Sequence, residues 1–423
     1  MTSTPTFQRI APLLLALALL AGLATTAEAR GFRTGFIDPM ERAFAETDGP
    51  GAYAAARAAG ASVIRLPVVW GDVGRTRAAD LTDSRDPAYF FGPVDDRVME
   101  ITANGLEPLL SIYVTPPWAR TSGPSPDPGA LGGFATALAR RYAGDFVRRD
   151  GVALPRVRLF QIWNEPNLKD YLDQSGGGAP AHYRAMLQAA YPAIKGVHAD
   201  NVVVAGGLGP FGGKGNLYGT RPLPFMRAAL TPDTPFDAWA MHPYTSGPPA
   251  RKAATKGDAS IGNLPEVRSI LRRTGHGDAE LWATEFSWDT SPPDPFAVPL
   301  REQARWIAEG FYRMWAHGVS TLIWFQLRDN PNGTFEWGQT FQSGLYFETT
   351  TRYADEKAKP GLRAFRFPFV ALPAGRGIRI WGRTPDSAAG QVVVERRRGS
   401  RWRRVTTVRA DGDGIFQRRL AGH

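Results

Sequence analysis

Two glutamates lie where apolar stretches of this sequence end, 120 residues apart in the chain. Glu165 closes the stretch in "RLFQIWNEPN" (158–167), and Glu285 lies within "LWATEFSW" (281–288). Polar groups at the end of a buried strand are costly unless they bind something or satisfy one another. A pair of carboxyl groups can divide acid and base work, since one protonates a leaving oxygen while the other attacks carbon or activates water. The pair therefore indicates bond cleavage by two carboxyl groups.

Further polar and aromatic side chains lie within these and other apolar stretches or in the loops that follow them. Aromatic rings suit the apolar faces of sugars, and an amide beside a carboxylate suits sugar hydroxyls. We therefore predict a substrate site that also contains Arg65, Trp118, Asn164, His242, Tyr244, Trp288 and Trp324.

Eight short apolar stretches recur along the chain, and helical stretches fall between them. The expected strands are 32–38, 62–70, 107–114, 157–163, 201–207, 237–244, 279–288 and 320–327. The expected helices are 93–104, 130–143, 180–198, 263–274, 299–317 and, within "KPGLRAFRFPFVAL", 359–372. This alternation predicts parallel strands with right-handed crossovers, and the count of eight favours a (β/α)8 barrel (TIM barrel) over an open sheet. Sites of such barrels lie where the strands end, which is where the selected residues fall.

With both glutamates placed at strand ends, the sequence resembles the clan A glycoside hydrolases. "WNEPN" (163–167) and "TEFSW" (284–288) match the two catalytic strand ends, and the resemblance covers about residues 30–372. Family 39 is the most similar, followed by the cellulase-like family 5. The resemblance implies a retaining β-type glycosidase with its carboxyl groups about 5–5.5 Å apart.

The resemblance also implies a role for each residue. Glu165 would be the general acid/base and Glu285 the nucleophile. Asn164 would hold the 2-hydroxyl of the sugar. Around the nucleophile, Tyr244 would donate a hydrogen bond, Arg65 would favour the ionised form, and His242 would buttress the site. Trp324 would form the floor under the sugar, with Trp118 and Trp288 as further loop aromatics.

After residue 374 the pattern changes to short stretches typical of antiparallel strands. We predict a small C-terminal β module over 375–423, following a catalytic barrel over 30–372, and expect it to pack against the barrel because it has little core of its own. Residues 375–423 carry twelve arginines and four acidic residues, which is +8 of the chain's net charge of +10. The module would therefore bind an anionic cell-wall polymer by charge, or present a solvated basic surface.

The N-terminus has the layout of a secretory signal peptide. The apolar run 10–24 precedes "AEA" (27–29), so we expect residues 1–29 to be removed after Ala29 and the protein to be secreted. The apolar run has 15 residues, which is short for a membrane anchor, and no later segment is apolar enough to cross a bilayer. Nucleic acid is not expected as the specific partner of an exported protein.

The sequence gives no indication of a metal or another cofactor. Cysteine is absent, and the six histidines are scattered without the spacing of metal ligands. The expected partner is a poly- or oligosaccharide, with glucan, mannan, xylan and bacterial exopolysaccharide all open. The alternative function is a carbohydrate- or wall-binding barrel that does not turn over its ligand.

Overall fold

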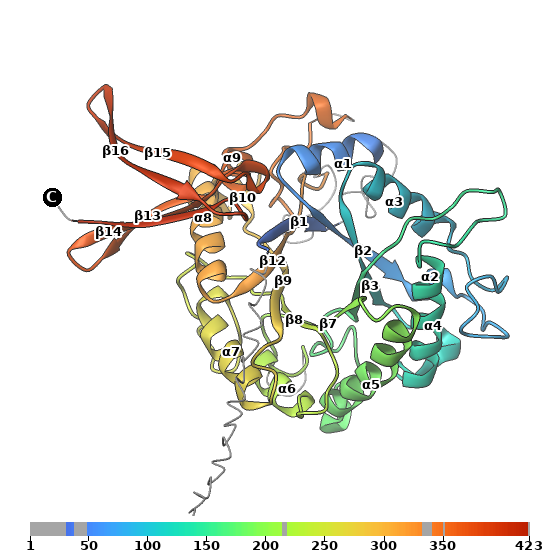
Figure 1. Ribbon diagram of the computed structural model, residues 1–423. Helices are drawn as coiled ribbons and strands as arrows, with labels where there is room; N and C mark the ends of the chain where they lie inside the picture. Colours follow the sequence, from blue (N-terminus) through green and yellow to red (C-terminus); the bar gives the residue numbers. More distant parts are fainter. Residues whose placement is uncertain (1–30, 38–48, 214–217, 332–340, 350–351, 422–423) are drawn as a thin grey trace, which may run out of the picture. The chain divides into compact units, whose positions relative to one another are not determined.

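The computed structural model describes residues 31–37, 49–213, 218–331, 341–349 and 352–421. Its centre is a closed barrel of eight parallel strands in the order β1-β12-β9-β8-β7-β6-β3-β2 (Figure 1). The strands are β1 (Arg33–Ile37), β2 (Val63–Val69), β3 (Glu107–Tyr113), β6 (Leu159–Ile162), β7 (Val202–Leu208), β8 (Ala238–Met241), β9 (Glu280–Phe286) and β12 (Val319–Trp324). The predicted (β/α)8 barrel is confirmed. The first residue of each barrel strand lies within two residues of the first residue of the corresponding predicted strand.

Helices surround this barrel (Figure 1). They are α1 (Gly49–Ala58), α2 (Trp70–Val73), α3 (Gly92–Ala103), α4 (Pro128–Arg141), α5 (Ala179–Val197), α6 (Pro222–Ala229), α7 (Leu264–Arg273), α8 (Leu300–Ala316) and α9 (Pro360–Arg366). The loops contain the short strands β4 (Arg120–Ser122), β5 (Ser125–Pro126), β10 (Thr290–Ser291) and β11 (Val298–Pro299). Among the described residues, no helix combines the length and apolar character needed to cross a bilayer. The predicted signal peptide, 1–29, lies outside the described residues.

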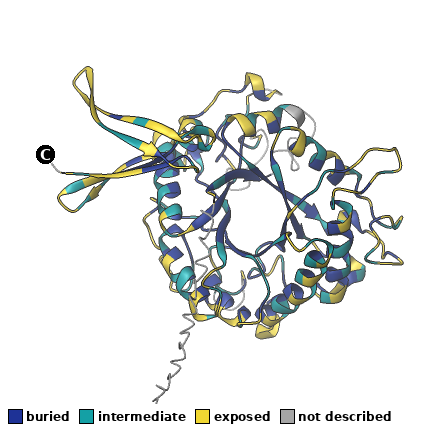
Figure 2. Ribbon diagram, viewed as in Figure 1, coloured by how far each residue is buried: buried dark blue, intermediate teal, exposed yellow. Residues whose placement is uncertain are grey.

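The strands bury both of their faces, as Figure 2 shows. Successive side chains of a strand point to opposite sides, so one set fills the barrel and the other packs against the helices. The inner cluster contains Ile37, Val63, Leu109, Leu159, Val204, Ala238, Ala240, Trp282 and Ile323. A larger cluster lies between the strands and the helices and includes Phe36, Phe286, Phe311 and Trp324.

The C-terminal module is built from antiparallel strands, as predicted. β13 (Phe369–Ala374), β14 (Gly377–Arg383) and β17 (Ile415–Leu420) form one sheet, and β15 (Gly390–Arg398) pairs with β16 (Arg401–Ala410) in a hairpin. The expected helix over 359–372 is wrong in its second half, because α9 ends at Arg366 and β13 begins at Phe369. Pro368 explains the end, since a residue before proline avoids the helical region, and Phe367 has φ −134° and ψ 73°.

The module packs against the barrel through Trp381 of β14, which is fully buried. Its ring lies 6.3 Å from that of Phe32, next to β1, and 5.7 and 5.6 Å from Tyr312 and Trp315 of α8. Arg383 also donates to the Thr34 hydroxyl at 3.0 Å. The module thus completes its small core with side chains of the barrel and of α8.

Candidate active site

The turn after β6 has a backbone that positions Glu165. Trp163 and Glu165 have φ values of +74° and +40°, which non-glycine residues adopt at a cost of about 1–3 kcal/mol each. Neighbouring strands hold this turn, since the Trp163 amide donates to the Ile112 carbonyl at 2.9 Å and the Glu165 amide to the Gly207 carbonyl at 3.0 Å. Strained backbone held by such bonds is common at functional sites.

The two glutamates selected from the sequence meet at the carboxyl ends of the barrel strands. One oxygen of Glu165, one of Glu285 and a ring nitrogen of His242 all lie within 4.8 Å of one another. His242 Nδ1 is 3.0 Å from Glu165 Oε1 and 3.6 Å from Glu285 Oε2. Both carboxyl groups retain some access to solvent, with side-chain exposures of 14% and 13%. A ligand can therefore reach both groups at once.

Donors surround the carboxylate of Glu285. Arg65 pairs with its Oε1, and the Tyr244 hydroxyl donates to its Oε2 at 3.0 Å. Burial opposes ionisation of Glu285, but His242, Arg65 and Tyr244 together outweigh burial and hold its pKa below the ordinary value. Burial, with the charges of Glu285 and Glu165, raises the pKa of Tyr244 well above its usual range. Tyr244 therefore remains a donor and Glu285 remains charged.

Arg65 connects Glu285 with Asn164. It is 2% exposed, and its Nη2 donates to Asn164 Oδ1 at 2.7 Å and to Ser111 Oγ at 3.1 Å. Because the Asn164 oxygen accepts from Arg65, the orientation of that amide is fixed. His242 is fully buried, and its Nε2 lies 3.2 Å from the Thr284 hydroxyl, which fixes the ring beside Glu165.

Tyr171, which the sequence did not single out, also belongs to the site. Burial and the charges of Glu165 and Glu285 raise its pKa, while Arg65 and a hydrogen bond with Asn164 oppose that shift. Its carbonyl accepts from Trp163 Nε1 at 2.7 Å. Tyr171 lies in the loop after β6 with no periodic pattern around it, and its only signal was proximity to Glu165 in the chain.

The prediction of Trp324 as the sugar floor is wrong. Trp324 is fully buried on the helix side of β12, where its ring contacts Phe286 at 5.2 Å and its Nε1 donates to the Ser343 carbonyl at 3.0 Å. The next residue, Phe325, is half-buried, packs on the inner cluster of the barrel and contacts Phe341 at 4.8 Å. A one-residue difference moves a strand side chain to the opposite face, so Phe325 has the position that Trp324 was expected to take.

The two loop tryptophans make their described contacts with residues other than the two glutamates. Trp118 donates to the Gly74 carbonyl at 2.7 Å and packs edge-on against Trp70 at 5.6 Å, beside α2. Trp288 is 6% exposed and donates to the Thr245 carbonyl at 2.7 Å. Neither has a described contact with Glu165 or Glu285.

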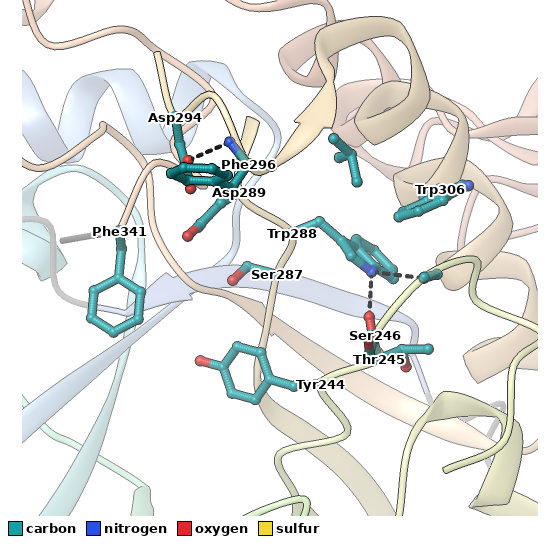
Figure 3. Close-up of a pocket in the computed structure, with 13 residues that line it drawn as sticks. Tyr244, Thr245, Ser246, Ser287, Trp288, Asp289, Asp294, Phe296, Trp306 and Phe341 are labelled. Atoms are coloured by element: carbon teal, nitrogen blue, oxygen red, sulfur yellow. Dashed lines mark hydrogen bonds between the residues drawn. The ribbon is translucent and has the colours of Figure 1, made fainter. Parts of the chain in front are cut away.

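Trp288 lines a cavity of about 350 Å³ beside Tyr244 (Figure 3). Ser287, Asp289, Phe296 and Phe341 also line it. Burial raises the pKa of Asp289 to about 6. Because Tyr244 bonds Glu285, this cavity adjoins the carboxyl pair and extends the site toward the loop after β9.

Glu165, His242 and Glu285 are also the group of described residues whose ligand atoms converge closely enough for a metal ion. Both oxygens of Glu285 already face protein donors, Arg65 at one and Tyr244 at the other. This donor set suits a carboxylate held ionised by the protein more than it suits a metal ligand.

Comparison with known proteins places the chain among glycoside-hydrolase barrels in fold. No family model matches it. The β-xylosidase of Geobacillus stearothermophilus is 23% identical over 262 residues, which cover 56% of this chain and 49% of that protein. The chain thus spans about half the length of this relative.

Two solved structures share the fold over most of the chain. A family 39 glycoside hydrolase from the gut symbiont Bacteroides cellulosilyticus WH2 superposes with a TM-score of 0.57 and 19% identity, covering 93% of this chain and 80% of that one. A family 39 β-xylosidase from Caulobacter crescentus superposes with a TM-score of 0.53 and 18% identity, covering 83% of this chain and 77% of that one. The predicted resemblance to family 39 glycoside hydrolases is confirmed.

Proposed function

We propose that this protein is a retaining glycosidase that hydrolyses β-linked poly- or oligosaccharides. The observation that carries the proposal is the pair Glu165 and Glu285. One carboxylate oxygen of Glu165 lies within 4.8 Å of one of Glu285, and the two carboxyl groups have different neighbours. Retaining enzymes hold their carboxyl groups about 5–5.5 Å apart, whereas inverting enzymes need about 6.5–9.5 Å to admit a water molecule. The family 39 fold supports the same assignment.

Glu285 is assigned as the nucleophile because its surroundings keep it ionised. It attacks the anomeric carbon while Glu165 protonates the departing glycosidic oxygen, which leaves a glycosyl ester on Glu285. Formation of that ester removes the charge of Glu285, so Glu165 next takes a proton from water as the water attacks the ester-linked carbon. The sugar leaves with its original anomeric configuration, and both carboxyl groups return to their starting states.

The neighbouring residues receive positioning and binding roles. Asn164, fixed by Arg65, is assigned to the 2-hydroxyl of the sugar at the cleavage point. His242 holds Glu165 in place through its Nδ1, and Phe325 supplies the aromatic surface beneath the sugar. Xylan is the first substrate to test, because the curated relative is a β-xylosidase.

The proposal includes export of the protein, with residues 1–29 as the signal peptide. The run of apolar residues 10–24 before "AEA" supports it. N-terminal sequencing of the protein collected from culture medium tests the predicted cleavage after Ala29. A protein retained in cells with its first residues intact would contradict it.

Sugar release from a panel of β-linked polysaccharides tests the activity. The wild type is compared with Glu165→Gln and Glu285→Gln, and Glu280→Gln is the matched control. Glu280 lies on the same strand as Glu285, but its Oε2 accepts from Trp282 Nε1 at 2.8 Å and lies outside the site. We expect release by the wild type and the control only. Binding of a polymer by the wild type without release from any member would favour the non-catalytic carbohydrate-binding barrel.

A further inference from the structure

The hairpin of β15 and β16 collects arginines on one face. Its register pairs Val392 with Val408 and Val394 with Thr406, followed by two pairs of arginines toward the turn. Side chains of a strand alternate between faces, and directly paired residues share a face. The face that begins with Val392 and Val394 therefore continues as what we term the arginine face, formed by Arg396, Arg398, Arg401 and Arg403.

The two halves of this face differ in exposure. Near the barrel it is covered, since Val394 is 9% exposed and Thr406 accepts from Arg418 Nη1 at 2.8 Å. Toward the turn, all four residues of the arginine face are exposed, and the end of the hairpin is coloured as exposed in Figure 2. The four guanidinium groups are thus open to a ligand.

This arrangement works against the stability of the hairpin. Arg396 lies opposite Arg403, and Arg398 opposite Arg401, and like charges in directly paired positions are destabilising. No ion pair joins any of the four to an acidic residue in the part of the chain that the structure describes. Several arginines elsewhere have acidic partners, as in the pairs Arg141–Asp95 and Arg148–Asp150. The arginine face therefore lacks a counter-charge within the described chain.

We propose that the arginine face binds an anionic polysaccharide whose repeating carboxylate or sulfate groups supply that counter-charge. Guanidinium groups bind such oxyanions in bidentate geometry, and a two-by-two array can engage successive charged sugars. The choice of a polysaccharide among polyanions rests on the proposed function, because the same chain would then hold its substrate polymer near the barrel. The face has no aromatic side chain for stacking bases or entering a lipid surface, since Trp402 pairs with Arg397 on the opposite face.

The experiment measures retention of the full chain on immobilised polygalacturonate as the salt concentration rises. All proteins carry Glu285→Gln, so that turnover cannot alter the matrix, and the result does not depend on the glycosidase assignment. One variant adds R396Q, R401Q and R403Q on the arginine face. Its matched control adds R397Q, R404Q and R409Q on the opposite face and loses the same charge. Melting temperatures verify that both variants fold.

Three exposed ion pairs together correspond to about tenfold in affinity, so we expect the arginine-face variant to bind at least about tenfold more weakly at 0.1 M salt. The control should change by less than about threefold, because long-range charge alone is largely screened at this ionic strength. Equal losses in both variants would overturn the proposal in favour of simple net charge. The proposal would also be overturned if the parent protein were not retained on polygalacturonate. The same holds if the parent protein bound duplex DNA or phosphatidylglycerol vesicles more tightly than polygalacturonate under the same conditions.

Discussion

Replacing Tyr244 by Phe is expected to move the acid limb of the activity profile to higher pH. The Tyr244 hydroxyl donates to Glu285 Oε2 at 3.0 Å, and with His242 and Arg65 it holds the pKa of Glu285 below the ordinary value, against the effect of burial. A donor to a carboxylate favours the charged form, so its removal raises the pKa. A hydrogen bond to a charged group contributes about 1.5–3 kcal/mol, which corresponds to about 1–2 pKa units.

The assay is kcat/KM against pH on an aryl β-glycoside that the wild type hydrolyses. We expect the acid limb of Tyr244→Phe to lie about 1–2 pH units above that of the wild type. Tyr191→Phe is the matched control, since it also removes a phenol bonded to a carboxylate, Asp237 Oδ1 at 3.3 Å, but outside the site. An acid limb that stays in place in Tyr244→Phe, or that moves equally in both variants, would refute the assignment of Glu285 as the group that must be ionised.

Two further predictions concern the aromatic residues at the end of β12 and the buried ion pair of Lys359 with Asp329. Trp324→Ala should lower the free energy of unfolding by about 3–5 kcal/mol in a denaturant titration, because it empties a fully buried position. Phe325→Ala should instead raise KM by about tenfold with a smaller loss of stability; a larger KM effect at Trp324 would contradict the placement of the two rings. Lys359→Met should cost about 3–5 kcal/mol because it removes the buried partner of Asp329, 2.6 Å away. Adding Asp329→Asn should recover part of that loss, and a double variant no more stable than Lys359→Met would contradict the pairing.

The sequence predicted the carboxyl pair because topology alone brings it together. Parallel strands place all of their carboxyl ends at one edge, so Glu165 and Glu285 had to lie on the same rim once eight strands were recognised. Arg65, His242 and Tyr244 followed by the same reasoning, and their contacts in the structure join the three residues to the glutamates.

The errors arose where the sequence holds no periodic signal. In "LIWFQL" (322–327) both faces of the strand are covered, so no alternation in the sequence distinguishes Phe325 from Trp324 as the aromatic residue that points inward. The position of Tyr171 depends on the path of an irregular loop. The change from α9 to β13 depended on one proline, Pro368, within an apolar stretch compatible with either structure.

The most direct test of the central claim is to identify the residue that becomes covalently linked to the sugar. The wild type is incubated with a 2-deoxy-2-fluoro glycoside that carries a good leaving group, and the intact mass and the labelled peptide are determined. We expect one fluoro-sugar per chain on the peptide that contains Glu285, with no label in Glu285→Gln. A label on Glu165, or turnover of glycosides with inverted configuration and no adduct, would contradict it.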